Sequence, residues 1–472
     1  MKNIIIAIIL IPLFNFCLLP GASADEISDL KQDLKVMRNQ VDLQAKQIKE
    51  QQKIIEVMQR KIGELDTTTE ATAKAVKSAK GAIVSADKKE LGKDTLVVTW
   101  SDGVQYKTED ENFKLKAGFR IQADFGWATE DADVKARLGK MIHPAEFRRA
   151  RAYISGSLFK EAVYKMQLDF AGGEVGMRDI YIGLKNVPYL DLVRVGQFTE
   201  PFSLEDMTSS NHITFLERSL PYALSIHRNT GIGFNANPFD KRVTISSSAY
   251  YNADDQAIPV NNSANFATRI TGLPWYEEDG AKLVHLGAAY GFRNSADEDK
   301  ISFSYSSPPE IHLMPNFVDT GNFNGSYANL LGLESALIYG PFSLQSEFIQ
   351  SFVDLKGTSK VGYFNGFYAY ASYFLTGEHR NYNKFWGTFG STEVIRNFSM
   401  KEWSPGAWEI AARYSYLDLC SHDVKGGALW DLTVGLNWYL NSNMKVMLNY
   451  VHAHPNGIGD ADIIAVRCQV EY

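Results

Sequence analysis

Residues 113–125 read FKLKAGFRIQADF, in which apolar and polar side chains alternate without a break. In an extended strand, successive side chains point to opposite faces, so one face here is apolar and the other carries charges along its length. The segment is also longer than most strands of soluble sheets. These features favour a strand that crosses a membrane at a tilt, with lipid on one side and a polar lumen on the other.

Similar segments recur to the C-terminus, and we count sixteen, an even number as in bacterial barrels. The predicted strands are 113–126, 146–159, 161–171, 176–186, 191–199, 229–238, 242–252, 280–293, 299–306, 327–339, 342–354, 361–375, 407–419, 428–440, 443–454 and 461–472. The fold class is therefore all-β, a sixteen-stranded antiparallel transmembrane β-barrel over residues 113–472. The last predicted strand alternates in phase with its terminal Tyr472, as closing strands of outer-membrane barrels do.

The connections between the predicted strands fall into two classes. Very short joins at 340–341 and 441–443 contain Gly, Pro, Asn and Ser, which suit periplasmic turns. Five connections are too long for a compact soluble domain and are expected to be extracellular loops. These are 127–145, 200–228, 253–279, 307–326 and 376–406.

The N-terminus has the pattern of an export signal. Lys2 precedes an apolar run, and the small residues Ala22-Ser23-Ala24 predict cleavage after residue 24. A retained anchor and a lipoprotein acylated at Cys17 are the alternatives. Cys420 and Cys468 are the cysteines left after cleavage, and we expect both to be unpaired.

Residues 25–66 predict an α-helical coiled coil, because they contain neither aromatic residues nor proline and follow a heptad pattern. Its a positions are Ile27, Leu34, Val41, Ile48, Ile55 and Ile62, and its d positions are Leu30, Met37, Gln44, Gln51, Met58 and Leu65. The alternative is a single amphipathic helix lying on the barrel. We expect a trimer with the coil in the periplasm, followed by a linker over 67–112.

Composition and motifs exclude several classes of function. The net charge of -7 disfavours binding to nucleic acid. The sequence contains none of the HExxH, CxxC, GxSxG and P-loop patterns, so we predict neither catalytic residues nor a metal or cofactor.

Several motifs are similar to those of the phosphate-selective porin O and P family. They are VGQFTEPFSLE at 195–205, FLERSL at 215–220, FRRAR at 147–151 and FRIQAD at 119–124. The resemblance covers roughly residues 113–472 and is strongest before residue 240. It implies a trimeric sixteen-stranded porin whose third loop folds into the lumen and forms a constriction; this loop corresponds here to 200–228, after the fifth predicted strand. The alternative for this connection is an extracellular lid.

Candidate pore residues follow from strand parity and from this loop. Arg120, Arg149 and Arg151 should face the lumen, whereas Arg148 could take either face. Arg218 and Arg228 lie on the presumed constriction loop, as do the acids Glu205 and Glu217. Guanidinium groups match phosphate and carboxylate, and rings of arginine select anions in pores. The loop acids equally suit a transverse field that sieves solutes without selecting phosphate.

The sequence thus predicts an outer-membrane porin for passive diffusion of small hydrophilic solutes, either unselective or favouring anions such as phosphate or polyphosphate. Its expected partners are two further copies, outer-membrane lipid and these solutes. The alternative from another class is a structural or adhesive envelope protein tethered, for instance to peptidoglycan, through its coiled coil.

Overall fold

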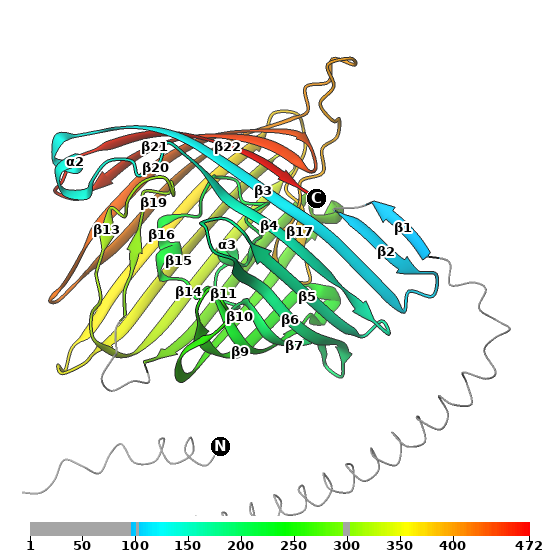
Figure 1. Ribbon diagram of the computed structural model, residues 1–472, viewed down its shortest axis with the longest axis horizontal. Coiled ribbons are helices and arrows are strands. Elements are labelled where there is room, and N and C mark those ends of the chain that lie inside the picture. Colours follow the sequence, from blue (N-terminus) through cyan, green and yellow to red (C-terminus); the bar gives the residue numbers. More distant parts are fainter. Residues whose placement is uncertain (1–95, 101–102, 296–302) are drawn as a thin grey trace, which may run out of the picture. The chain divides into compact units, whose positions relative to one another are not determined.

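The computed structural model describes residues 96–100, 103–295 and 303–472, and within them sixteen antiparallel strands close into a barrel (Figure 1). The signal peptide and coiled coil predicted for residues 1–66 lie outside the described residues. The barrel strands are β3 (Phe113–Glu130), β4 (Ala145–Leu158), β5 (Ala162–Asp169), β6 (Gly176–Val187), β7 (Leu190–Thr199), β8 (Arg228–Ala236), β9 (Val243–Ala253), β10 (Pro259–Glu277), β11 (Lys282–Asn294), β14 (Gly325–Tyr339), β15 (Phe342–Leu355), β16 (Val361–Phe374), β19 (Ala407–Ser421), β20 (Val424–Asn441), β21 (Met444–Pro455) and β22 (Ala461–Glu471). The prediction of a sixteen-stranded antiparallel barrel is confirmed.

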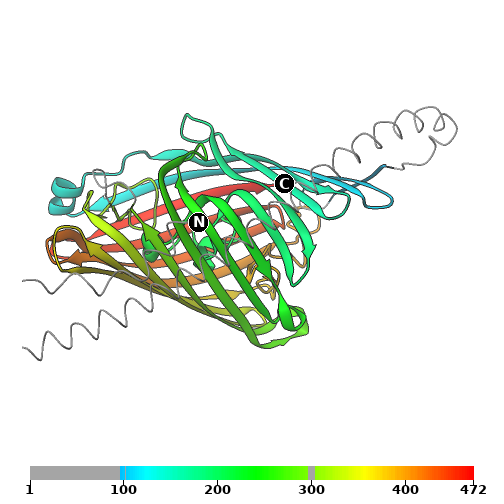
Figure 2. The same ribbon diagram turned by 90° about the horizontal axis from the view of Figure 1, so that it is seen from below.

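The barrel closes where its last strand pairs with its first. β22 is antiparallel to β3, with Ala461 opposite Glu130 and Glu471 opposite Arg120. Beyond Arg120 the start of β3 is free of β22 and pairs instead with β2 (Val104–Thr108), which pairs with β1 (Leu96–Trp100). This hairpin falls within the segment predicted as a linker and extends the sheet past the C-terminus (Figure 2).

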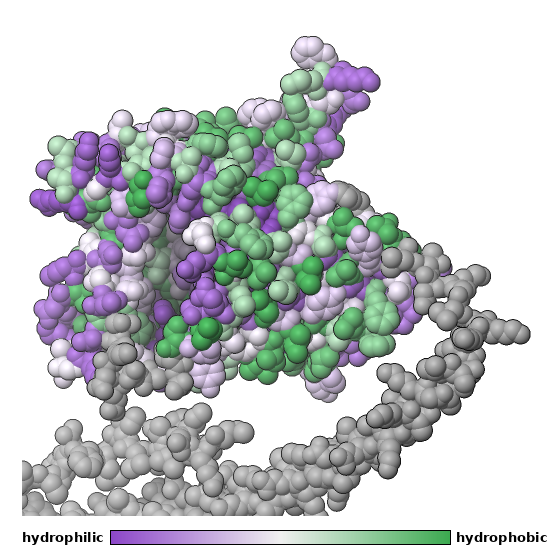
Figure 3. All heavy atoms as spheres, viewed as in Figure 1, coloured by the Kyte–Doolittle hydropathy of each residue, from purple (hydrophilic) through white to green (hydrophobic). Residues whose placement is uncertain are grey.

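Alternation along the strands separates an apolar outside from a polar inside. Outward side chains such as Ile182, Leu333 and Val195 are more than half exposed. Many hydrophobic residues cover the strands on the face seen in Figure 3. Inward positions bury polar groups instead, and Arg269, Arg413 and Arg467 are among the largest fully buried side chains. Among the described residues, no helix is long and apolar enough to cross a membrane.

Two strand predictions were wrong: one barrel strand was missed and one was predicted where there is none, so the total of sixteen is still correct. The predicted loop 253–279 contains the strand β10, whose prolines and asparagines obscure the alternation of apolar and polar residues. Pro274 lies at a shift in the pairing register between Gly272 and Trp275. The predicted strand 299–306 is not a barrel strand. Its described part has an isolated bridge at Phe303 and begins the two-residue strand β12 (Ser306–Ser307). Phe303 and Tyr305 are buried in a hydrophobic cluster, so their alternation does not mark a lipid face.

The long connections do not all leave the same end of the barrel. Strands alternate in direction, so the connection 375–406 emerges at the end that also carries the tight turns 340–341 and 442–443. We call this the short-turn end. The prediction of an extracellular loop at 376–406 was therefore wrong. This connection contains a small hairpin, β17 (Tyr382–Asn383) and β18 (Thr388–Phe389), which is anchored inside the barrel.

The connection 200–227 lies inside the lumen, not as a lid outside it. It contains the short helices α3 (Leu204–Met207) and η1 (Leu220–Leu224). The side chains of Phe202, Leu204 and Phe215 are at most 1% exposed. The loop packs against the wall from β15 to β22: the backbone N–H groups of Leu204 and Glu205 donate to the Glu347 carboxylate, at 3.0 and 2.7 Å. It fills one side of the lumen and leaves the side of β3–β8 open.

Candidate functional site

Two bulges in the open wall turn consecutive charged residues inward. In β4, Arg149 pairs with Gln122 and Phe147 pairs with Ala123, which leaves Arg148 unmatched and breaks the alternation. Both Arg148 and Arg149 therefore line the lumenal cavity. In β6, a shift of the same kind leaves Arg178 and Asp179 together opposite Gln167, and both line the cavity.

The open side of the lumen forms a cavity of about 520 Å³. β3–β8 form one wall, loop 200–227 forms another, and the hairpin of connection 375–406 closes part of the short-turn end. Among the described residues, the lining holds eight arginines and one lysine but two carboxylates, Asp179 and Asp206. The cations are Arg120, Arg148, Arg149, Arg151, Lys165, Arg178, Arg194, Arg218 and Arg228.

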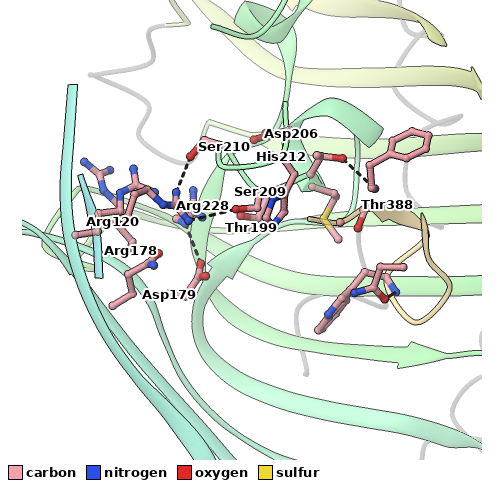
Figure 4. A pocket seen from close by; sticks show the side chains of 18 of the residues that line it. Arg120, Arg178, Asp179, Thr199, Asp206, Ser209, Ser210, His212, Arg228 and Thr388 are labelled. Atoms are coloured by element: carbon pink, nitrogen blue, oxygen red, sulfur yellow. Dashed lines mark hydrogen bonds and ion pairs between the residues drawn. The ribbon is translucent and has the colours of Figure 1, made fainter. Parts of the chain in front are cut away.

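Arg120 is the arginine of this lining that bonds to serine hydroxyls of loop 200–227 (Figure 4). Its guanidinium donates to the hydroxyls of Ser210 at 2.6 Å and Ser209 at 3.2 Å, both on loop 200–227. Its Nε is buried and has no hydrogen-bond partner, and the carboxylate that attracts it most strongly is that of Glu471, its cross-strand neighbour on β22. Arg120 also lines a second cavity of about 340 Å³ that reaches Tyr472, so the two cavities meet beside it.

The other predicted basic residues are brought to the same cavity, each with an acceptor. Arg151 pairs with Asp169 at 2.7 Å, and Arg149 donates to Gln122 at 2.8 Å and pairs with Glu217 at 3.3 Å. Arg218, on loop 200–227, donates to three backbone carbonyls of that loop. Arg228 lies at the start of β8, just past the loop on which it was expected, and pairs with Asp179 at 2.9 Å.

Neither of the two loop acids lines the cavity, although Glu217 pairs with Arg148 and Arg149, which do. Glu205 accepts hydrogen bonds from Ser219 and pairs with Arg413 on β19 at 3.3 Å. Glu217 bonds to Arg148 at 2.9 Å and to Arg467 on β22 at 2.6 Å. The two acids hold the loop to the walls, and Glu217 offsets part of the charge of the lining arginines.

Three buried arginines that strand parity did not single out hold the inner segments in place. Arg413, on β19, bonds to Glu205, Glu310 and the Glu217 carbonyl. It therefore holds the connections 200–227 and 295–324 to the barrel wall. Arg467 bonds to Asp124 and to the carbonyl of Leu216. Arg269 pairs with Glu334 and donates to the carbonyls of Trp386 and Gly387, which anchors the hairpin.

His212 lies on loop 200–227 where the two cavities meet. Burial, and then the neighbouring cations Lys445 and Arg120, lower its pKa to about 3. It is therefore neutral near pH 7 and adds no charge to the lining. Among the described residues, no three His, Cys, Asp or Glu side chains are grouped to hold a metal ion.

The open wall also contains two cations that no motif singled out. Arg194, on β7, stacks its guanidinium over the ring of Phe198 at 3.9 Å and lies 4.8 Å from the ring of Trp386. Lys165, on β5, pairs with Asp179 at 2.6 Å. Alternation would have turned both inward, but without a motif they looked like ordinary wall residues.

Comparison with known proteins places the chain among outer-membrane channels. Porin O of Pseudomonas aeruginosa is 26% identical over 432 residues, 79% of this chain and 92% of its own length. A Caulobacter vibrioides protein without an assigned function is 26% identical over 75% of this chain and 71% of its own length.

Among solved structures, the anion-selective porin from Comamonas acidovorans matches with a TM-score of 0.48 and 11% identity, over 76% of this chain and all of its own. DcaP of Acinetobacter baumannii matches with a TM-score of 0.48 and 10% identity, over 78% of this chain and 99% of its own. Residues 115–472 match the family described as phosphate-selective porin O and P. The protein is therefore a member of this porin family, a channel of the outer membrane.

Proposed function

We propose that this porin passes small hydrophilic solutes and favours anions such as phosphate or polyphosphate. The observation that carries the proposal is the lining of the larger cavity, where nine cationic side chains face two carboxylates. The whole chain is acidic, at -7, so the preference must come from this local cluster. In a narrow passage with low-dielectric walls, such a cluster raises the local concentration of anions.

Arg120 is the residue we expect to contact a passing anion most directly. Its two hydrogen-bond partners on loop 200–227 are neutral serine hydroxyls. A phosphate oxygen there would gain charge-assisted hydrogen bonds without breaking an ion pair. Arg149, Arg151, Arg218 and Arg228 would add to the attractive field while remaining bonded to their own acceptors.

The competing proposal is a porin that sieves by size alone. Acids beside the cavity partly offset its arginines, because Asp169 neutralises Arg151 and Glu217 neutralises Arg148. Reversal potentials decide between the two. In a potassium chloride gradient across a planar bilayer, we expect the wild-type channel to favour chloride, and added phosphate to lower the chloride current.

The double variant Arg149→Ala/Arg151→Ala should shift the reversal potential toward cations, because it removes two inward charges and leaves Glu217 and Asp169 less compensated. Arg242→Gln is the control, since Arg242 bonds to carbonyls at the short-turn end and does not line the cavity. A wild-type channel without charge preference, unchanged by the double variant, would refute anion selection and leave size-based sieving.

We further propose a homotrimer whose N-terminal coiled coil lies in the periplasm. Support comes from the unbroken heptad register of residues 25–65 in the sequence. We propose no enzymatic role, because the buried charges described above are engaged in fixing the inner loops.

A further inference from the structure

We propose that the larger cavity binds organic anions that carry an aromatic ring, with the ring against Trp386 and the acid group on the neighbouring arginines. The inference rests on the proposed anion preference and narrows its substrate class. The cavity of about 520 Å³ lies in the size range of sites for small organic ligands. Inorganic phosphate would leave most of it filled with water.

The short-turn side of this cavity is aromatic. Trp386 and Phe389 from the hairpin and Tyr181 from β6 all contribute to its lining. The Trp386 ring is only partly buried, and the backbone that carries it is fixed, because Arg269 donates to the Trp386 and Gly387 carbonyls at 3.1 and 2.7 Å. Arg194 lies over this ring at 4.8 Å and the Phe385 ring packs edge-on against it at 4.8 Å. The part of the indole that stays exposed in the cavity is a surface against which a flat ring can pack.

Arg194 joins this aromatic side to the basic side. Its guanidinium lies 4.8 Å from the Trp386 ring and 5.5 Å from the Tyr181 ring. Its guanidinium donates a long hydrogen bond of 3.5 Å to the Thr199 carbonyl and also interacts with the Tyr181 hydroxyl. The carboxylates that attract it, Glu200 and Asp179, act on it without forming one of the close ion pairs of the described residues. A guanidinium that stacks on Phe198 and also neighbours the Tyr181 and Trp386 rings suits a ligand that presents an acid group beside a planar ring.

A ligand of this class would use both features at once. Its phosphate or carboxylate would contact Arg194, and Arg228 and Lys165 lie along the same wall. Its ring would stack on Trp386. An aliphatic anion of equal charge would gain the first contact without the second, so the cavity should distinguish the two.

The test uses the full-length protein in planar bilayers and measures how phosphate monoesters block the chloride current. Phenyl phosphate and methyl phosphate carry the same charge and differ in the ring. We expect phenyl phosphate to block at about a tenfold lower concentration, the effect of one favourable aromatic contact. Equal block by the two esters in the wild-type channel would overturn the inference, and this comparison needs no variant.

Variants then locate the ring. Trp386→Leu should bring the two esters to within about twofold of each other and leave block by methyl phosphate unchanged. Trp403→Leu is the matched control, because Trp403 belongs to the same connection but is 93% exposed and does not line the cavity. A tenfold preference that survives Trp386→Leu would also overturn the inference.

The outcomes separate this inference from the function on which it rests. If inorganic phosphate and both esters block equally, the anion preference stands and the aromatic site is refuted. If none of them blocks and the current shows no charge preference, the proposed anion preference fails, and the aromatic site fails with it.

Discussion

Arg413 shows how a single buried charge can organise the inside of a barrel. It is 1% exposed, and it holds Glu205, Glu310 and the Glu217 carbonyl at 2.6 to 3.3 Å. Glu310 has a positive φ of 53°, a backbone geometry that costs free energy in a residue other than glycine. The ion pair therefore compensates for local strain while joining two inner loops to β19.

Replacing Arg413 with Met should lower the free energy of unfolding by about 3 kcal/mol, because two buried carboxylates lose their partner. Urea unfolding of the detergent-folded barrel, followed by tryptophan fluorescence, measures the change. Arg396→Met, at an exposed site of connection 375–406, should leave stability within about 0.5 kcal/mol.

Adding Glu310→Gln to Arg413→Met should recover part of the loss, since it removes one of the stranded charges. Equal stability of Arg413→Met and the wild type would contradict the structural role assigned to this arginine.

At the level of single residues, parity placed Arg120, Arg149 and Arg151 toward the lumen, and their chemistry there remains a prediction. Parity failed to resolve Arg148, because a bulge is set by the pairing with β3 and leaves no mark in the local sequence. Arg269, Arg413 and Arg467 also looked like ordinary inward residues. Their function as anchors depends on carbonyls and acids that are distant in the chain.

At the level of elements, connections enter the lumen from both ends of the barrel, and two of them meet inside it. Loop 200–227 comes from one end and the hairpin β17–β18 from the short-turn end, and they meet where the Phe389 N–H donates to Thr208 at 3.5 Å. The sequence motifs predicted the first inner loop. They gave no sign of the second, because its anchor, Arg269, lies on β10, the strand that was missed.

Replacing residues 382–389 with Asn-Gly should raise the single-channel conductance about twofold or more, since Trp386, Thr388 and Phe389 leave the cavity. The ends can be joined by a tight turn, because the Gly390 N–H donates to the Asn381 carbonyl at 2.9 Å. Anion preference should persist, as eight of the nine lining cations lie on strands β3–β8 and Arg218 lies on loop 200–227.

The same connection offers a matched control. Ser399 and Ser404 pair through both backbone hydrogen bonds, and Met400 and Trp403 between them are 82% and 93% exposed. Replacing residues 400–403 with Asn-Gly should leave conductance unchanged. If the two replacements change conductance equally, the hairpin does not restrict the passage.

At the level of the whole molecule, the barrel wall is uneven. β5 has 8 residues and β8 has 9, whereas β15 has 14 and β20 has 18. At the usual rise and tilt of barrel strands, 8 residues span about 20 Å, less than an apolar band of about 25 Å. In a single copy, lipid would contact polar chain ends here. We expect the face of β5–β8 to be covered by neighbouring copies in the proposed trimer.

Lipid contact can be measured on both sides of the barrel in a variant that lacks the native thiols Cys420 and Cys468, both free and exposed. Single cysteines at Ile182 on β6 and Leu333 on β14 replace outward side chains that are 69% and 59% exposed in one chain. A fluorophore at residue 333 should be quenched strongly by brominated lipid, whereas one at residue 182 should be quenched several-fold less. A label shielded by protein cannot contact the bromine atoms of the lipid. Equal quenching at the two positions would therefore place both faces in lipid and rule out a trimer in which neighbouring copies cover β5–β8.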